Sequence, residues 1–424
     1  MTNGESGAGA LRVALVLGTS TGGIGRHVLS LTRGLTRSGV AVTVFCPAAT
    51  EAQFQFAAAG GRVVPLEIPA SLDTRNLRAV NELCRSLRPA ESVGAPGSSR
   101  VTLLGAGHQQ GHPAGHEAGP TDAAGRAGPT DAVGRDQVDI VHAHGLRAGL
   151  VAALARPAGV PLVVTWHNTV LGGGLRATAL RAGERYVARS ADVTLGASED
   201  LVARVRSLGG RDVRLGAVAA PPLPPLTRPP AEVRLELDAD HRPLVLSVGR
   251  LHPQKGYDVL VSAAARWRML DPAPVVAIAG TGPAYRNLAA RILASRAPVT
   301  LLGQRDDVAD LLAAADLAIV SSVWEARQLF AQEALAAGVP LVATEVGGLP
   351  GLVGDAARLI PPNDVDALDV AVRELLVDPE LRARYVAAGR ARAATWPTEA
   401  DTVAQVGSVY AELTGRPDLT TVRP

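Results

Sequence analysis

Cysteine is scarce in this chain, since 424 residues include only Cys46 and Cys84 and no C-x-x-C pair. This scarcity argues against a disulfide framework and against a structural zinc site, and it fits a reducing compartment. The first residues, MTNGESGAGALRVALVLG, have no basic segment ahead of their short apolar run. We therefore expect a strand there rather than a signal peptide, and a cytoplasmic protein.

Long apolar runs and blocks of one charge are also missing. No segment approaches the roughly 18 uninterrupted apolar residues of a membrane span. The chain has 42 basic and 40 acidic residues, a formal net charge of +2, and no long Lys/Arg block. Nucleic acid is therefore not expected as a partner. A peripheral contact with an anionic membrane stays open, and the oligomeric state is not determined.

Hydrophobic residues make up 47% of the chain, enough for two domains. Short Val- and Leu-rich runs alternate with amphipathic ones, which predicts an α/β fold of two doubly wound Rossmann-like domains facing across a cleft. Prolines between Pro221 and Pro230 interrupt the pattern. We expect an N-terminal domain over 1–220, a linker over 221–230, a second domain over 231–395, and a C-terminal helix and tail over 396–424 that pack back on the first domain.

One segment departs from this alternation. Residues 90–136 are rich in Gly, Ala, Pro and His, and contain the near-repeat AGPTDAAGR–AGPTDAVGR. We interpret them as a disordered surface insertion. Its histidines, spaced four apart, are separated by Gly and Pro, so a helical metal site is disfavoured; they are His108, His112 and His116.

The stretch LSVGRLHPQKGYDVL, residues 246–260, places two cations where a buried strand ends and a helix begins. Arg250 and Lys255 would add their charges to the positive end of the helix dipole, which predicts an anion site. The motif G-x-x-x-x-G-K-[ST] is absent, so this is not a P-loop. The alternative is a pair of solvated surface cations.

A second stretch, SSVWEARQLFAQEALAAG, carries two carboxylates. Glu325 stands in a loop and Glu333 in a helix expected over Leu329–Ala337. A carboxylate can accept two hydrogen bonds from the vicinal diol of a ribose, while the first amides of the helix can receive a phosphate. Those amides belong to Gln328, Leu329 and Phe330. Alternatively, acidic residues near a helix start merely complement its dipole.

The motif G-R-x5-K-G, followed by E-x7-E and then EALAAGVPLVAT, resembles the retaining glycosyltransferases of family four, which have the GT-B fold. GGIGRHVLSLTRGLTRSG, VDIVHAHG, LVVTWHN and LLGQRDDV resemble further parts of that family. The resemblance covers nearly the whole chain apart from the insertion. It implies transfer of a sugar from a UDP- or GDP-sugar to an unknown hydroxyl, with retention of configuration and with no cofactor or metal.

The same resemblance implies roles for individual residues. Arg250 and Lys255 would hold the donor diphosphate, Glu333 the ribose, and Glu325 the transferred sugar. His144 would line the reaction centre from the opposite domain. The remaining expected contacts are Gly22 and Gly23 near the phosphate and sugar, Gln304 and Arg305 near the base, and the amides of Gln328, Leu329 and Phe330.

Three other patterns allow different chemistry. Gly18, Ser20 and Gly22 spell the G-x-S-x-G of a hydrolase elbow, but no earlier strand exists to supply the oxyanion loop. His142 and His144 share one strand face and could ligate a metal, with His167 as the only other histidine near a strand end in this half; the set is incomplete. A D-x-D at Asp364 and Asp366 is explained better by helix capping.

The chain also departs from the family. Most relatives have E-G-F-G at the first glutamate, whereas this chain has EARQ, with Arg327 and Gln328 in place of an aromatic residue and a glycine. Ala219–Ala220 replace the usual N-G ahead of the linker. These changes motivate an alternative, a nucleotide-sugar-binding protein without transfer activity. A dinucleotide oxidoreductase is disfavoured because GTSTGGIG does not supply G-x-G-x-x-G.

Overall fold

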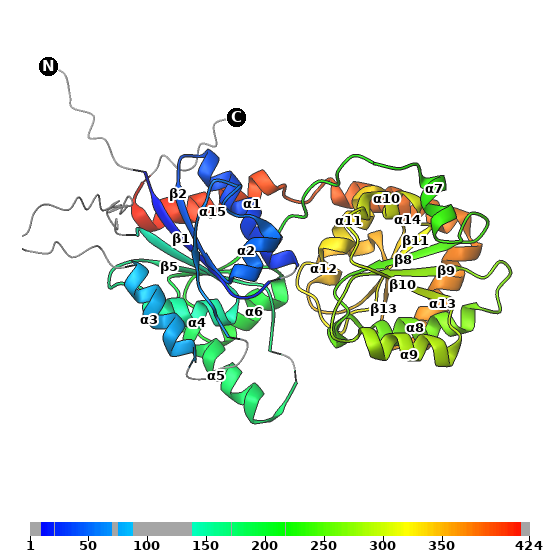
Figure 1. Cartoon of the computed structure of the whole chain (residues 1–424), viewed down its shortest axis with the longest axis horizontal. Helices are drawn as coiled ribbons and strands as arrows, with labels where there is room; N and C mark the ends of the chain where they lie inside the picture. The colour runs from blue at the N-terminus through cyan, green and yellow to red at the C-terminus, as the bar shows by residue number, and fades with distance from the viewer. Residues whose placement is uncertain are drawn as a thin grey trace, which may run out of the picture.

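The computed structural model describes residues 10–20, 22–69, 75–87, 138–170, 172–216 and 218–416. Figure 1 shows two domains side by side, each a sheet with helices on both faces. The insertion predicted over 90–136, with its three histidines, and the tail after residue 416 lie outside the described residues.

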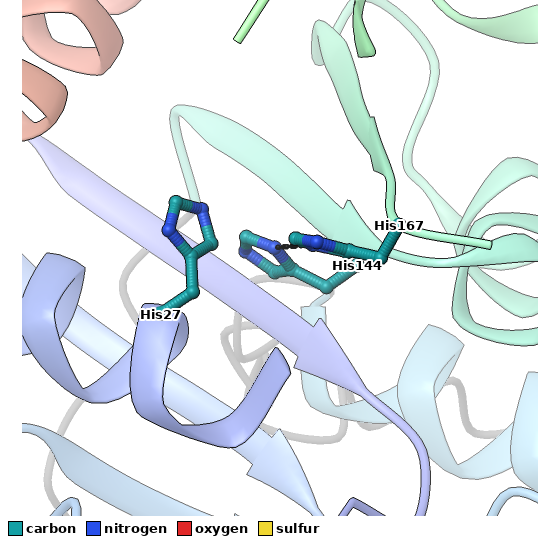
Figure 2. A group of neighbouring side chains, drawn as sticks. All are labelled: His27, His144 and His167. Atoms are coloured by element: carbon teal, nitrogen blue, oxygen red, sulfur yellow. Dashed lines mark hydrogen bonds between the residues drawn. The ribbon is translucent and has the colours of Figure 1, made fainter. Parts of the chain in front are cut away.

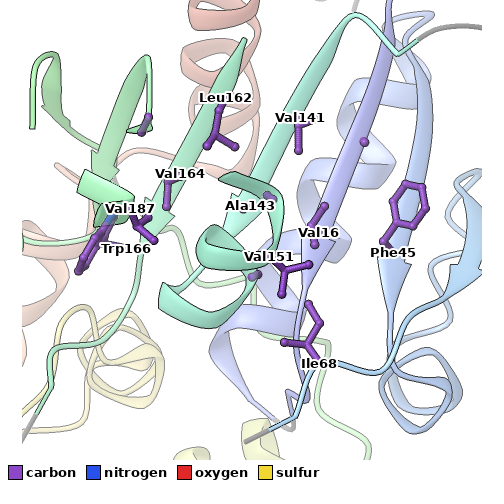
Figure 3. Packing of buried hydrophobic residues seen from close by; sticks show 14 of the residues in the cluster. Val16, Phe45, Ile68, Val141, Ala143, Val151, Leu162, Val164, Trp166 and Val187 are labelled. Carbon is purple, nitrogen blue, oxygen red and sulfur yellow. The ribbon is translucent and has the colours of Figure 1, made fainter. Parts of the chain in front are cut away.

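The first domain is built on a parallel seven-stranded sheet of order β3-β2-β1-β4-β5-β6-β7. Its central strands are buried on both faces, which explains why they read as continuous apolar runs. Figure 3 shows Val151 of α4 beside Val16 of β1, within a buried cluster that also includes Val141 of β4. The strands are β1 (Arg12–Leu17), β2 (Ala41–Cys46), β3 (Arg62–Pro65), β4 (Ile140–His144), β5 (Leu162–Trp166), β6 (Val193–Gly196) and β7 (Val213–Leu215); the helices are α1 (Gly23–Arg37), α2 (Ala48–Phe54), α3 (Arg75–Leu87), α4 (Leu146–Ala155), α5 (Gly174–Ser190) and α6 (Glu199–Ser207).

The second domain repeats this plan with a six-stranded parallel sheet of order β10-β9-β8-β11-β12-β13. The strands are β8 (Leu244–Val248), β9 (Val275–Ala279), β10 (Val299–Gly303), β11 (Leu317–Val320), β12 (Leu341–Thr344) and β13 (Arg358–Ile360). The helices are α7 (Pro230–Glu236), η1 (Pro253–Lys255), α8 (Tyr257–Trp267), α9 (Tyr285–Ser295), α10 (Val308–Ala314), α11 (Leu329–Ala337), α12 (Leu349–Val353), η2 (Gly354–Ala356), α13 (Val365–Val377) and α14 (Pro379–Ala393).

Both sheets reverse their strand order beside their first strand. β1 lies between β2 and β4, and β8 lies between β9 and β11. Ligands of open α/β sheets bind at such reversals, outside the carboxyl ends of the strands. The turns after β1 and β8 therefore lie at the positions where the two sheets are expected to bind a ligand.

The chain passes between the domains twice. The first passage is the proline-rich segment before α7, where Thr227 is fixed to Asp310 by two hydrogen bonds, of 2.9 Å from its amide and 2.5 Å from its hydroxyl. The second leads from α14 to α15 (Glu399–Thr414), which packs on α1 of the first domain (Figure 1). Val403 and Tyr410 of α15 are buried there with Leu31 and Leu35. None of the helices in the described ranges has the length and apolar character needed to cross a bilayer.

Candidate active site

A cleft of about 700 Å³ lies between the two domains, at the carboxyl ends of both sheets. Its first wall comes from the turn between β1 and α1, the end of β5 and the end of β6. Its second wall comes from the segments after β8, β9, β10 and β11. The predicted residues that line it are Gly22, Gly23, Arg250, Lys255, Gln304, Arg305, Glu325, Gln328, Leu329, Phe330 and Glu333.

The turn from β8 to α8 carries the cations. Arg250 follows β8 and its side chain is exposed at the cleft. Lys255 ends η1 and donates to Oε1 of Glu325 at 2.6 Å. The next residue, Gly256, has φ +60°, and a Cβ there would lie 2.1 Å from the carbonyl oxygen of Ser321. Glycine is therefore required at this position for Lys255 to reach the cleft.

Glu325 is buried, and its Oε1 accepts hydrogen bonds from the Lys255 ammonium and from the Ser322 hydroxyl, each at 2.6 Å. The carboxylate is thus held on the cation side of the cleft. The Lys255 ammonium has three N–H donors, so it can bind an anionic ligand in the cleft while it keeps its contact with Glu325.

Glu333 lies one turn inside α11 and is 7% exposed. Burial raises the pKa of this carboxyl group, and Arg26 opposes that shift. Arg26 comes from α1 of the other domain and reaches the Glu333 carboxylate at 3.1 Å. The carboxylate expected to bind ribose is therefore paired across the cleft in this structure.

Gln328 occupies the N-cap of α11, with φ −70° and ψ +117°. This backbone is accessible to any residue, so the side chain causes no strain where relatives have glycine. Its Oε1 accepts from the Phe330 amide at 3.3 Å. The prediction that this amide is a free donor is wrong for the conformation described, because Gln328 caps its own helix.

Arg305 lines the cleft together with Gln304, but its guanidinium is paired. It donates to Asp307 at 2.7 Å and to Glu236 at 2.6 Å, and these carboxylates raise its pKa. Gly22 has open space where a Cβ would be, and a Cβ on Gly23 would touch Leu329 at 3.5 Å. The glycine turn thus faces the start of α11 across the cleft.

Ser20 has a structural role in the described part of the chain. Its hydroxyl accepts from the Gly25 amide at 2.9 Å, and its own amide donates to Thr50 at 3.3 Å. No histidine within the described ranges is hydrogen-bonded to it. The serine therefore stabilises the first turn of α1, as expected if it is not a nucleophile.

His144 is not where the resemblance implied. The histidine that lines the cleft is His167, after β5, whereas His144 is 3% exposed and lies behind it, with their ring nitrogens 3.3 Å apart. His27 of α1 packs against both rings. Sequence reasoning missed His27, although H-x-H at the end of β4 and the histidine after β5 had already pointed to this region.

Both ring nitrogens of His142, the other histidine of the H-x-H pair, have a hydrogen-bond partner. His142 Nδ1 lies 2.7 Å from the Tyr410 hydroxyl of α15, and Nε2 lies 2.7 Å from the Thr165 hydroxyl. Asp364 accepts from the Ala367 amide at 2.8 Å and caps α13, which confirms the capping interpretation of the D-x-D. Neither residue lines the cleft.

Arg327 connects the cleft to the interdomain passages. Its Nε donates to the Val218 carbonyl at 2.8 Å, and its guanidinium lies 5.9 Å from the centre of the Trp396 ring. Burial and the nearby charge of Arg392 lower its pKa to about 10. Arg327 thus places a further cation at the cleft, and its hydrogen bond to Val218 holds it against the segment that leads from the first domain to the second.

The matches to known protein families divide between the same two domains. Residues 233–392 match the model of "Glycosyl transferases group 1", and residues 22–221 match that of "Glycosyl transferase 4-like domain". The chain belongs to the group 1 glycosyltransferases. Curated relatives named D-inositol 3-phosphate glycosyltransferase, from Mycobacterium tuberculosis and Mycobacterium bovis, are 36% identical in an alignment of 300 residues that covers 64% of this chain. The chain spans 61% of the length of those relatives.

Solved structures give the same fold for this group 1 glycosyltransferase. Anabaena HepE in complex with UDP-glucose superimposes with a TM-score of 0.73 at 18% identity, covering 95% of this chain and 100% of that one. Sucrose-phosphate synthase from Thermosynechococcus elongatus gives 0.70 at 20% identity, covering 96% and 99%. The expected GT-B architecture is confirmed.

Proposed function

We propose that this protein transfers a hexose-like sugar from a UDP- or GDP-sugar to a hydroxyl acceptor with retention of configuration. The observation that carries the proposal is that the cations Arg250 and Lys255, after β8, and the buried carboxylate Glu333 line the same wall of a two-domain cleft. Cations beside a helix start favour a diphosphate, and a carboxylate favours a ribose diol.

In this proposal Arg250 and Lys255 hold the diphosphate and Glu333 binds the ribose. Glu325 faces the transferred sugar. Gln304 and Arg305 lie near the base, while the turn at Gly22–Gly23 leaves room for phosphate and sugar. The departing phosphate takes the acceptor proton on the face it leaves, so that no separate protein base, metal or cofactor is assigned to the step.

The comparisons make two ligands worth testing first. HepE was solved with UDP-glucose, and the mycobacterial relatives are named for D-inositol 3-phosphate. We infer that a UDP-sugar is a suitable donor and a phosphorylated polyol a suitable acceptor. The acceptor hydroxyl can also belong to a lipid, if the protein contacts an anionic membrane. This source is tested with hydroxyl-bearing lipids as acceptors.

The test is a thermal-shift panel of UDP- and GDP-sugars, followed by turnover with the donor that raises Tm most, since a ligand stabilises the folded state that binds it. Donor binding with transfer supports the proposal. Donor binding without hydrolysis or transfer favours the alternative, a nucleotide-sugar-binding protein, which the Gln328 cap motivates. Binding of NAD(P)H in place of nucleotide sugars contradicts both.

A further inference from the structure

Three histidines from separate elements meet behind the cleft wall (Figure 2). One ring nitrogen from each of His27, His144 and His167 lies within 4.8 Å of the other two. The three rings are nearly equidistant, with centroids 5.5, 5.3 and 5.6 Å apart. Three imidazoles bound tetrahedrally to one zinc at about 2.0–2.1 Å would have ring centres roughly 5 Å apart. The dimensions of the cluster therefore fit a metal ion.

One nitrogen in this cluster is without a partner. Nε2 of His144 is fully buried and makes no hydrogen bond to any described residue. A buried polar atom without a partner has lost its hydrogen bonds to water and gained none in return, which destabilises the folded state. Buried polar groups are normally paired, so this atom, like Trp166 Nε1 and Arg327 Nη2, requires an explanation, and it belongs to a histidine of the three-imidazole cluster. The adjacent His142, with both nitrogens bonded, provides the contrast.

The chemistry of the cluster selects the class of ion. All three rings are buried, and a neutral imidazole is the form of histidine that binds metals. The group contains imidazoles and no carboxylate, which favours Zn²⁺, Cu²⁺, Ni²⁺ or Co²⁺ over Mg²⁺ and Ca²⁺.

We propose that His27, His144 and His167 form a binding site for a late first-row divalent cation, with Zn²⁺ as the natural ligand. His167 also lines the cleft, so water from the cleft would be the nearest source of a fourth ligand. The ion would fix the start of α1 to the ends of β4 and β5. Its role is to hold the first wall of the cleft, and the site is independent of the transfer reaction, which is assigned no metal.

The test uses Co²⁺ as a visible probe in the metal-free full chain. The imidazole-rich segment could bind cobalt by itself, so binding is also measured in a variant with His108, His112 and His116 replaced by Ala. We expect one tightly bound cobalt per chain, with tetrahedral d–d bands that Zn²⁺ removes, in both proteins. Loss of the bands in the triple variant would overturn the proposal.

Single variants then locate the ion. His27→Gln should weaken cobalt binding at least about tenfold, in line with the effect of losing support at a metal centre. His142→Gln, at the bonded neighbour, should keep it. Equal loss in both variants, or none in His27→Gln, overturns the assignment. X-ray absorption of the zinc-loaded wild type needs no variant: three imidazole ligands at about 2.0 Å support the site, and an oxygen-only shell overturns it.

Discussion

The two walls of the cleft differ in their chemistry. The wall from the second domain, the charged wall, carries cations and carboxylates, with Lys255 and Glu325 joined in one ion pair and Glu333 reached by Arg26 from the first domain. The wall from the first domain, the imidazole wall, presents glycines, the His167 ring and the cations Arg26 and Arg147, and none of its described lining residues is a carboxylate. Cations on both walls favour an anion, whereas only the charged wall has carboxylates that can accept hydrogen bonds from hydroxyl groups. The predictions below separate these roles.

The largest effect is expected from Lys255→Ala. Donor turnover should fall by about 100-fold or more, as when one preorganised electrostatic contact is removed from an active site. Glu325 would lose its cation while 7% exposed, at a cost of roughly 3–5 kcal/mol in unfolding free energy. Steady-state kinetics and urea denaturation measure the two losses.

Two control variants for Lys255→Ala separate the loss of donor binding from the loss of stability. Lys255→Ala combined with Glu325→Gln should recover stability without recovering donor binding. Arg266→Ala breaks a pair of the same 2.6 Å length with Asp366 on the surface and should leave both quantities nearly unchanged. Full turnover in Lys255→Ala would contradict the anion site.

A smaller loss is expected from Glu333→Gln. Nucleoside diphosphate binding should weaken about 10-fold, since a charge-assisted hydrogen bond to the ribose becomes a neutral one. Because the folded-state pKa of Glu333 is raised, its contribution to stability is present below the unfolded pKa and is lost as pH rises through the folded pKa. Removing the acid should therefore raise Tm at neutral pH while weakening binding; calorimetry of both processes checks this.

Arg26→Ala is the matched variant across the cleft. It removes the competitor for the same carboxylate and should leave donor affinity unchanged or higher. A drop in affinity equal to that of Glu333→Gln would show that the pair itself is needed for binding.

The imidazole wall predicts a specific pH dependence. Burial lowers the pKa of His27 from 6.5 to about 4. As the pH decreases below about 6.5, the unfolded chain binds a proton at His27, whereas the folded chain binds it only near pH 4. The free energy of unfolding therefore decreases as the pH is lowered from about 6.5 to about 4. His27→Gln should reduce the slope by up to about 1.4 kcal/mol per pH unit. Urea denaturation of metal-free protein between pH 7 and 4.5 measures it; identical slopes would be incompatible with a buried neutral ring.

The smallest effect is expected at Gln328. Gln328→Gly should free the Phe330 amide and tighten donor binding a few-fold, and it should cost only a few tenths of a kcal/mol because glycine is a tolerable N-cap. Gln328→Ala, which removes the cap but keeps the Cβ, separates the two causes. Isothermal titration with UDP gives the affinities. Weaker binding in both variants would mean that Gln328 itself contacts the donor.

The charged wall was largely predictable from the sequence. Arg250, Lys255 and Glu333 are each placed by the element that carries them, at the end of a buried strand or one turn inside a helix, so local patterns located them. The helix expected over Leu329–Ala337 is α11. The hydrogen bond from the Phe330 amide to the Gln328 side chain was not predictable, because it depends on the rotamer of Gln328 and not on the spacing of residues in the sequence.

The imidazole wall was predictable only in part. His142 and His144 were both recognised at the end of β4, but spacing could not tell which would be paired and which left with a buried nitrogen. His27 sits in a helix whose amphipathic pattern accounts for a buried residue there without any chemistry. His27 lies near His144 and His167 because α1 packs on the sheet, and this packing belongs to the tertiary structure, which local sequence patterns do not reveal.

The return of α15 to the first domain has a consequence for synthesis on the ribosome. Val403, Val406, Val409 and Tyr410 complete a core that otherwise consists of residues from the first half of the chain. When the whole second sheet has emerged, the earlier-made domain still lacks this strip and the hydroxyl that binds His142. The domain translated first therefore cannot complete its core until the last helix has been synthesised, and a truncation before Glu399 would destabilise the amino-terminal domain.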